Sequence, residues 1–358
     1  MNTKRLILIP LLLLTALLVS SCGTRGPATT NWSGLSADAD RAYLASGSFV
    51  YAVDLKTGLE VWRYPAAADS KRLFYSTPVL TQDGQLLINS EGSTHDFLSL
   101  DPATGKENWA APFNAKAAWV APALASDGKI YAPNTDGFLY TLDMSGKQIS
   151  DPIEIGGSLW SAPVTDGSNL YVTSLDHHLH VIKLSDNSSQ VVDLGGAAPS
   201  SPVVGKEGAY VGSFASKIES VSSSADHKAI ADATNWIWGT PVVDGDTLYY
   251  ADLNGNVFSY DIASGKQNWT NVKLDGPVVA GLLVMGNQIY AGTEAGSLYA
   301  LDQNGKTVWN KSVGGNLYTT PVYSSDLVIV APYLQADYIL AAYDADGKQA
   351  WTFMPAKK

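Results

Sequence analysis

A repeat of about 40 residues is the feature of this chain that most constrains its fold. Each copy opens with a short apolar strand that usually begins at a proline, and this marker position can be followed along the chain. It falls at Leu35, Pro78, Pro122, Pro163, Pro202, Pro241, Gly281 and Pro321. The intervals are 43, 44, 41, 39, 39, 40 and 40 residues, which gives eight copies. A period of this length is typical of solenoids and propellers, because one copy cannot bury its apolar face alone.

Each copy predicts four short antiparallel strands. In the clearest copy, from Trp238 to Trp269, the expected strands cover residues 242–243, 248–251, 257–260 and 267–269. Asn254-Gly255 is a hairpin signal, since both central residues of such a turn need a positive φ. No segment shows a helical period, because apolar residues alternate or cluster between Gly, Asp and Asn. The sequence therefore predicts an all-β fold, an eight-bladed β-propeller of four-stranded antiparallel blades, whose ring closure hides the sheet edges.

The first residues carry the pattern of a secretory leader. Lys4 and Arg5 precede an apolar run of 14 residues, which is too short for a comfortable membrane span. The run ends in Val-Ser-Ser-Cys, and Cys22 is the only cysteine of the chain. This ending resembles the bacterial lipobox, which implies a lipid on Cys22 that anchors the protein. The alternative is an ordinary signal peptide with an unrelated cysteine.

These signals divide the chain into three expected segments. They are a lipoprotein signal peptide (1–21), a lipidated tether (22–31) and the propeller (32–358). Gly23 follows the cysteine in place of the aspartate associated with inner-membrane retention. The resemblance to a lipobox therefore implies an extracytoplasmic protein, anchored in the outer membrane and facing the periplasm if the cell has two membranes.

The charge balance argues against nucleic acid as a partner. The chain has 34 acidic and 23 basic residues, a formal net charge of −11. It has no basic patch that could follow phosphates, and anionic lipid would not attract it, so the acyl chains must supply the membrane anchor. With a single cysteine, stability outside the cytoplasm must come from the apolar core and not from an internal disulfide.

A tryptophan closes the fourth strand in five copies: Trp62, Trp109, Trp269, Trp309 and Trp351. Together with the second-strand Leu-Tyr-Ala pattern and the Asp-x-x-Thr-Gly turn, it makes the repeat resemble the PQQ-like, or tryptophan-docking, β-propeller family. The resemblance covers essentially the whole expected mature chain. In that family the strand-four tryptophan packs on Ala and Gly positions of the next blade, which implies a structural blade-docking role for these five residues. A buried tryptophan removes about 150–250 Å² from water.

The family has an enzymatic and a non-enzymatic branch. Its dehydrogenases are much longer and bind pyrroloquinoline quinone with Ca²⁺ and an adjacent-cysteine disulfide, which this chain lacks. The acidic turn at 344–347 lacks the downstream glutamate of a calcium loop. No Gly-x-Ser-x-Gly elbow or phosphate-binding loop is present in the sequence. The resemblance therefore implies the non-enzymatic branch, without cofactor or metal, which includes lipid-anchored scaffolds of outer-membrane protein assembly.

Six aromatic residues stand three positions before the marker position of their copies: Trp32, Tyr75, Trp119, Trp160, Trp238 and Tyr318. Copies five and seven have Pro199 and Val278 instead. By symmetry these positions lie near the central opening, on one face of the ring. They predict either a binding mouth for an apolar, peptide or sugar ligand, or aromatic packing between blades.

Three further features stay open at this stage. The strand-four tryptophan is missing from copies three to five, where its place falls near Ser150, Val191 and Ile230. This indicates either an altered surface for a partner or drift that a repeat fold absorbs. The ring closes either by packing of blade eight on blade one or with a strand from residues 23–30. The only histidine cluster, His177, His178 and His180, is interpreted as a turn, because no further metal ligands are evident.

Two functional hypotheses follow. The first is a lipid-anchored scaffold that binds envelope proteins through its loop faces and catalyses no reaction. The second is a ligand-binding or enzymatic module whose site is the aromatic axial mouth.

Overall fold

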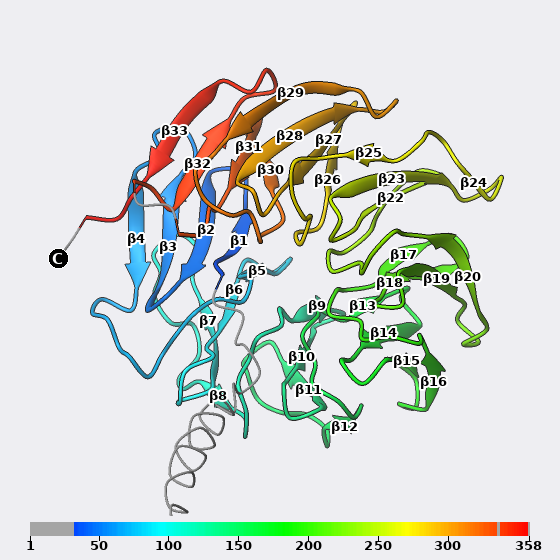
Figure 1. The fold of residues 1–358 in the computed structure, drawn as a ribbon. Helices are drawn as coiled ribbons and strands as arrows, with labels where there is room; N and C mark the ends of the chain where they lie inside the picture. Colours follow the sequence, from blue (N-terminus) through cyan, green and yellow to red (C-terminus); the bar gives the residue numbers. More distant parts are fainter. Residues whose placement is uncertain (1–31, 335–336, 357–358) are drawn as a thin grey trace, which may run out of the picture. The chain divides into compact units, whose positions relative to one another are not determined.

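The computed structural model of the protein describes residues 32–334 and 337–356. They form eight antiparallel sheets that follow one another around an axis as an eight-bladed β-propeller (Figure 1), which confirms the predicted fold class. These described residues contain no helix. In particular, the described part of the chain has no helix long and apolar enough to cross a membrane. The expected signal peptide, Cys22 and the tether lie outside the described residues.

The first four sheets are named blades 1 to 4 in chain order. Blade 1 contains β1 (Gly34–Ala37), β2 (Arg41–Ser46), β3 (Phe49–Asp54) and β4 (Glu60–Tyr64). Blade 2 contains β5 (Val79–Leu80), β6 (Leu86–Asn89), β7 (Asp96–Leu100) and β8 (Phe113–Asn114). Blade 3 contains β9 (Leu124–Ser126), β10 (Lys129–Pro133), β11 (Phe138–Asp143) and β12 (Ile153–Glu154). Blade 4 contains β13 (Val164–Thr165), β14 (Asn169–Thr173), β15 (His178–Lys183) and β16 (Ser189–Asp193).

The remaining sheets are blades 5 to 8. Blade 5 contains β17 (Val203–Gly205), β18 (Gly208–Gly212), β19 (Lys217–Val221) and β20 (His227–Asp232). Blade 6 contains β21 (Val242–Asp244), β22 (Thr247–Ala251), β23 (Asn256–Asp261), β24 (Lys266–Gln267) and β25 (Val272–Lys273). Blade 7 contains β26 (Leu283–Met285), β27 (Gln288–Gly292), β28 (Ser297–Asp302) and β29 (Thr307–Ser312). Blade 8 contains β30 (Val322–Ser324), β31 (Leu327–Val330), β32 (Leu340–Tyr343) and β33 (Gln349–Phe353).

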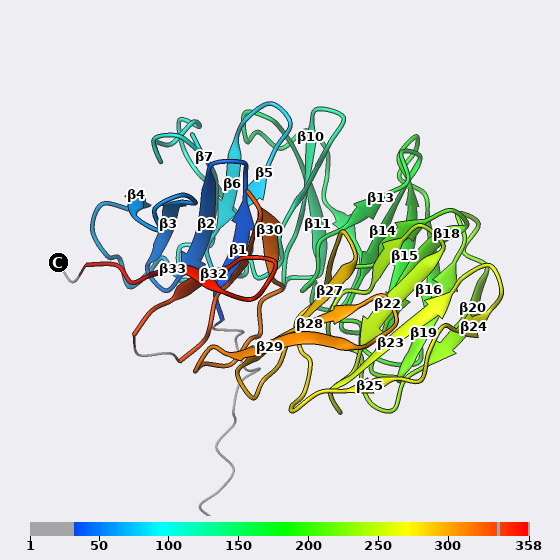
Figure 2. The ribbon, with the colours of Figure 1, turned by 90° about the horizontal axis from the view of Figure 1, so that it is seen from above.

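In seven blades the strands pair in chain order as a simple meander from the axis to the rim, and in blade 6 the extra strand β25 pairs with β23. First strands of successive blades, such as β13 and β17 or β26 and β30, contact one another and line the axis. In Figure 2 the cyan strands of blade 2 stand next to the blue strands of blade 1. Second and third strands are almost wholly buried, whereas outer strands such as β16 and β20 are mostly exposed. The core therefore lies between blades.

Five tryptophans join successive blades in one repeated way. Each indole lies on a glycine in the turn between the third and fourth strands of the next blade, and each of these glycines has a positive φ. A Cβ added to the glycine would stand 2.4 to 3.0 Å from the nearest ring atom, so only glycine leaves room for the indole. The pairs are Trp62–Gly105, Trp109–Gly146, Trp269–Gly305, Trp309–Gly347 and Trp351–Gly58.

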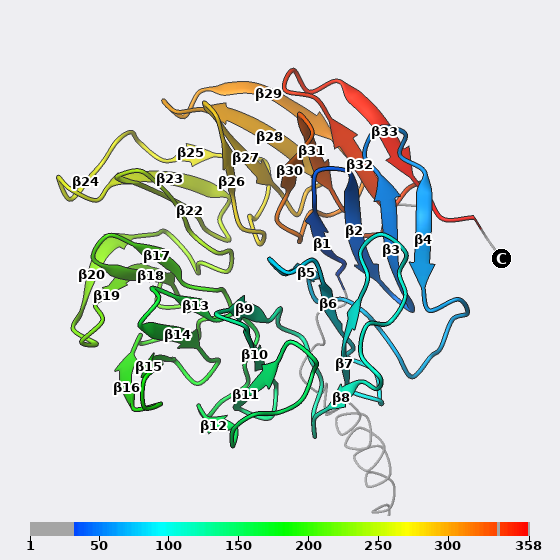
Figure 3. The same cartoon turned by 180° about the vertical axis from the view of Figure 1, so that it is seen from behind.

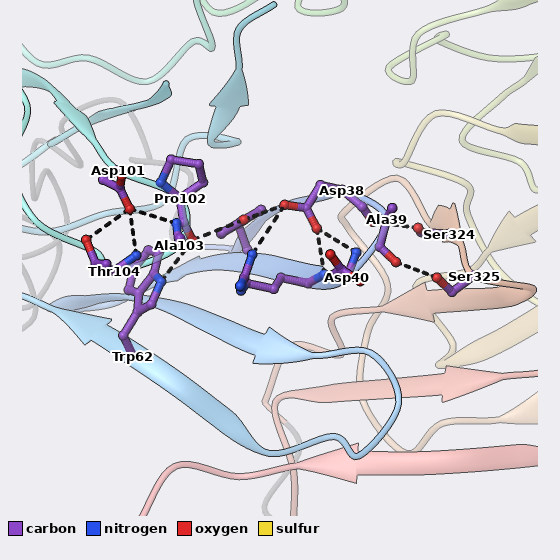
Figure 4. Close-up of polar contacts among 12 residues, drawn as sticks. Asp38, Ala39, Asp40, Trp62, Asp101, Pro102, Ala103, Thr104, Ser324 and Ser325 are labelled. Carbon is purple, nitrogen blue, oxygen red and sulfur yellow. Dashed lines mark hydrogen bonds and ion pairs between the residues drawn. The ribbon is translucent and has the colours of Figure 1, made fainter. Parts of the chain in front are cut away.

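The same turn also satisfies the indole N–H group. Each Nε1 donates to the backbone carbonyl one residue after the aspartate that begins the turn, over 2.7 to 3.0 Å. The acceptors, in the order of the tryptophans, are Pro102, Met144, Gln303, Ala345 and Leu55. Figure 4 shows this bond for Trp62. A buried tryptophan usually needs a partner for its N–H group, so the turn supplies both the space for the indole ring and the acceptor for its hydrogen bond.

Ring closure uses the same interaction. Trp351 of blade 8 lies on Gly58 of blade 1 and donates to the Leu55 carbonyl over 2.7 Å. The hydroxyls of Ser324 and Ser325 donate to the carbonyls of Asp38 and Ala39 over 2.5 and 2.6 Å (Figure 4). Figure 3 shows red β33 beside blue β4 from the opposite side. In the described residues both closing blades use only their own strands; residues 23–30 lie outside them.

In blades 2 and 6 the fourth strand does not reach its tryptophan as expected. In blade 6, β24 and β25 both pair with β23, and Trp269 stands between them outside a strand. Trp109 likewise stands outside a strand, between an isolated bridge at Glu107 and β8. The residue before each of these tryptophans is an asparagine. Its side chain bonds a serine of the third strand over 2.9 Å, which holds the outer segment where ladder pairing stops.

Alanine substitutions at two left-handed glycines should separate the docking contact from backbone strain. Gly58 and Gly47 have similar φ values, +69° and +61°, but only at Gly58 would the new Cβ meet the Trp351 ring, at 2.8 Å. We expect Gly47→Ala to cost about 1–2 kcal/mol of unfolding free energy. Gly58→Ala should cost about 2–3 kcal/mol more, measured by urea denaturation. Equal losses at the two sites would contradict the docking role of Trp351.

Candidate functional site

Three of the six expected axial aromatics meet in one cluster. The ring centroid of Trp32 lies 6.3 Å from that of Trp238 and 5.1 Å from that of Tyr318. These half-buried residues precede β1, β21 and β30, and therefore bring together blades 1, 6 and 8. A contact between blades 1 and 6 shows that the side chains reach toward one another and not only toward their neighbours along the ring.

The cluster includes aromatic residues that the sequence interpretation missed. Phe214 lies 5.2 Å from Trp238 and stacks on Trp236 at 4.5 Å, while Tyr333 lies 5.7 Å from Tyr318. Phe214 stands two residues after the second strand of its blade. Glu91 and Glu294 stand at the same place after β6 and β27. This position is thus a second source of axial side chains.

Two of the other expected residues, Trp119 and Trp160, do not join this cluster through any ring contact among the described residues. Trp119 is fully buried, donates its Nε1 hydrogen to the His95 carbonyl over 2.8 Å, and packs between Phe97 and Tyr140. It departs from the expected axial ring because its indole is enclosed between blades 2 and 3. Trp160 is half-buried, and its Nε1 donates to the Ser158 hydroxyl over 3.0 Å.

Carboxyl groups adjoin the aromatic cluster. Glu294 accepts a hydrogen bond from the Tyr318 hydroxyl over 2.8 Å. Both carboxyl oxygens of Glu91 are buried without a hydrogen-bond partner among the described residues. Burial raises the pKa of Glu91 from its usual 4.5 to about 8, so this side chain is mostly neutral at pH 7. Burial, followed by the charges of Glu91 and Tyr333, raises the pKa of Tyr75, the sixth expected aromatic.

The histidine cluster lies at a hairpin turn and on the strand β15 that follows it, and its members have local partners. His177 has a left-handed φ of 78°, and His178 Nδ1 lies 3.3 Å from an Asp176 carboxylate oxygen. His180 is buried, with its Nδ1 atom 3.2 Å from the Ser189 hydroxyl, and burial lowers its pKa. Within the described ranges no three His, Cys, Asp or Glu side chains are grouped so that they could hold a metal ion. The Asp344 carboxylate accepts backbone N–H groups of its own turn.

The profile of the family described as "Outer membrane protein assembly factor BamB" matches residues 46–277, 156–309 and 272–357. These overlapping segments cover most of the propeller repeat, so the predicted resemblance to this class of PQQ-like propeller is confirmed.

Curated relatives match over part of their length. The outer membrane protein assembly factor BamB of Burkholderia pseudomallei (strain K96243) is 32% identical over 109 residues, which are 30% of this chain and 28% of that protein. The protein of the same name from Nitrosomonas eutropha is 33% identical over 114 residues, 31% of this chain and 26% of that protein. The aligned segments thus span less than a third of these relatives.

Solved structures share the fold. The crystal structure of BamB from Moraxella catarrhalis has a TM-score of 0.67 and 16% identity, and covers 87% of this chain and 93% of that one. The computationally designed Ika8 protein has a TM-score of 0.69 and 11% identity, and covers 91% of this chain and 98% of that one. Identities this low bear on the fold alone.

Glu91 should make stability fall as pH rises. Its folded-state pKa is raised to about 8, so between about pH 4.5 and 8 the unfolded chain releases a proton that the folded state retains. We expect Glu91→Gln to match the wild type near pH 5 and to be more stable at pH 8 by on the order of 1–3 kcal/mol. Thermal unfolding at both pH values measures this, with the exposed Glu154→Gln as control. A stability effect of Glu91→Gln that is the same at pH 5 and at pH 8 would contradict the raised pKa of Glu91.

Proposed function

The chain belongs to the family of the outer membrane protein assembly factor BamB, and from this membership we propose that it is a protein-interaction scaffold in outer-membrane protein assembly. The family match along residues 46–357 is the observation that carries the proposal. The curated relatives are named for the same assembly role. The partners are other envelope proteins of the assembly machinery, and the protein itself catalyses no reaction.

The leader supports a location where such partners occur. The apolar run followed by Val-Ser-Ser-Cys directs export, and a lipid on Cys22 tethers the propeller to the membrane through residues 22–31. With Gly23 after the cysteine, the anchor lies in the outer membrane and the propeller faces the periplasm. The net charge of −11 favours protein partners over nucleic acid or anionic lipid.

The fold supports a binding role that needs a rigid platform. Each of the five tryptophan docks fixes one blade to the next, and Trp351 joins the last blade to the first. Loops on both faces are thereby held in place without further elements, which lowers the entropy lost when a partner binds.

The direct test is purification of the native, lipidated protein from membranes, followed by mass spectrometry of what accompanies it. We expect outer-membrane assembly components to be enriched over a control preparation that carries the tag alone. Recovery without any envelope protein, together with a small ligand that raises the melting temperature, would contradict the scaffold and favour the ligand-binding hypothesis.

Replacing Cys22 should release the protein from the membrane. Cys22→Ser removes the thiol that accepts the lipid but leaves the apolar run of the leader unchanged. We expect the variant to move from the membrane fraction to the soluble extracytoplasmic fraction, measured by fractionation and immunoblotting. Retention of the variant in a carbonate-washed membrane fraction, alongside the wild type, would show that Cys22 is not the anchor.

A further inference from the structure

Blades 3, 4 and 5 have other residues at the place of the docking tryptophan. In blade 1 this place is fixed by strand pairing, since Trp62 stands opposite Ala52 of the third strand. The corresponding pairs are Val181 with Gln190 in blade 4 and Ser220 with Lys228 in blade 5. The places expected near Val191 and Ile230 are therefore wrong by one and two residues, because the bulge that precedes Trp62 has no counterpart at the same place in these blades.

The turns of blades 4, 5 and 6 would receive tryptophans from blades 3, 4 and 5, and these turns differ in the residue at the left-handed position. In blades 4 and 5 the left-handed position is held by Asn187 and Ala225, with φ of 57° and 61°. In blade 6 it is still Gly265, with φ of +71°, and a Cβ there would have only the Tyr260 hydroxyl within 4 Å, at 3.5 Å. At the seam between blades 5 and 6, blade 6 thus has the receiving glycine, but blade 5 has no tryptophan that could lie on it.

A pocket of about 210 Å³ occupies the place of that indole. Its walls include Tyr210, Ser220 and Lys228 of blade 5 and Tyr260 and Gly265 of blade 6. Ile230 and Ile262 add apolar surface. A cavity of about 150 Å³ is enough for benzene in a protein core, so this pocket accepts one aromatic side chain. Lys228 is exposed and leaves the pocket open.

A buried hydroxyl in this wall lacks the partner that its equivalent has. Tyr210 pairs with Ser220 as Tyr43 pairs with Ala52, so the two tyrosines occupy the same place in their blades. The Tyr43 hydroxyl donates to an Asp38 carboxylate oxygen over 2.6 Å and lies 3.2 Å from the Pro102 carbonyl oxygen, which also accepts the Trp62 N–H.

Tyr210 is 1% exposed, and its hydroxyl has no hydrogen-bond partner among the described residues. A buried hydroxyl without a partner costs free energy, so this seam lacks polar contacts that the occupied dock of blade 1 has.

We propose that the seam between blades 5 and 6 is an open tryptophan dock that receives a tryptophan side chain from a partner polypeptide. The indole lies on Gly265, and its N–H group donates to the carbonyl of Ile262, which follows Asp261 as Pro102 follows Asp101. The five occupied docks of this chain give the recognition chemistry: a glycine that leaves room and a carbonyl that accepts one hydrogen bond.

The outer edge of blade 5 favours a polypeptide as the source of that indole. β20 is the last strand of its sheet, and His227, Lys228 and Ala229 along it are exposed. An extended segment can add to such an edge through main-chain hydrogen bonds while an alternate side chain enters a pocket. Glu207 and Lys228 at the pocket supply charges of both signs for its flanking residues.

Peptide binding to the purified propeller tests this inference without reference to the assembly role. The probe is acetyl-Val-Trp-Val-amide, with the leucine counterpart and N-acetyltryptophanamide as comparisons, measured by calorimetry. We expect the tryptophan peptide to bind at least about tenfold more tightly than either comparison. No measurable binding, or equal binding of the leucine peptide, would overturn the dock. Equal binding of N-acetyltryptophanamide would overturn the polypeptide source and indicate a small indole ligand.

Two variants locate the binding. Lys228→Trp should fill the dock from within the chain, raise the melting temperature and abolish binding of the tryptophan peptide. Lys311→Trp, on exposed β29 of blade 7, is the matched control and should leave binding unchanged. Gly265→Val closes the receiving side and should also abolish binding, which keeps the test decisive if one variant folds poorly. Binding that persists in folded Lys228→Trp or Gly265→Val would overturn the proposal.

Discussion

The contact between a strand-four tryptophan and the left-handed glycine of the following blade is the interaction on which this ring depends. The tryptophan and the glycine depend on each other, because glycine can adopt the positive φ of the turn and also leaves the space that the indole fills. Loss of a buried tryptophan typically costs about 3–5 kcal/mol. Because each tryptophan docks on the next blade, the contacts connect blades 6, 7, 8, 1, 2 and 3 in series, and the contact of Trp351 joins the last blade to the first.

The three seams without tryptophan depend on smaller side chains. Between blades 4 and 5, an aliphatic cluster that includes Val181, Leu194 and Val211 takes over the packing. Two of the three receiving turns have also lost their glycine, which fits a position where no ring has to be accommodated. The exception is Gly265, and the pocket beside it is the reason to regard that seam as a surface for a partner and not as simple drift.

The sequence was sufficient for the fold and insufficient for the details of the site. A repeat of eight copies leaves few architectures, because each copy needs a neighbour on both sides. The positions equivalent to the docking tryptophan in blades 4 and 5 could not be located from the sequence, because a β-bulge shifts the register and is recognised only once the strand pairing is known. The axial interpretation assumed eight equivalent environments, yet Phe97 and Tyr140 enclose Trp119 in one of them. Phe214 and Glu91 become recognisable only once the ends of β18 and β6 are known.

Hydrogen exchange at the seam between blades 8 and 1 tests the central claim most directly. In Trp351→Ala the docks at Trp62 and Trp109 remain, so opening should begin where the series is cut. The account predicts faster exchange of amides in β1–β4 and β30–β33, with blades 3 to 5 still protected as in the wild type. Uniform acceleration around the ring, or no change at blades 1 and 8, would contradict the claim that this contact closes the propeller.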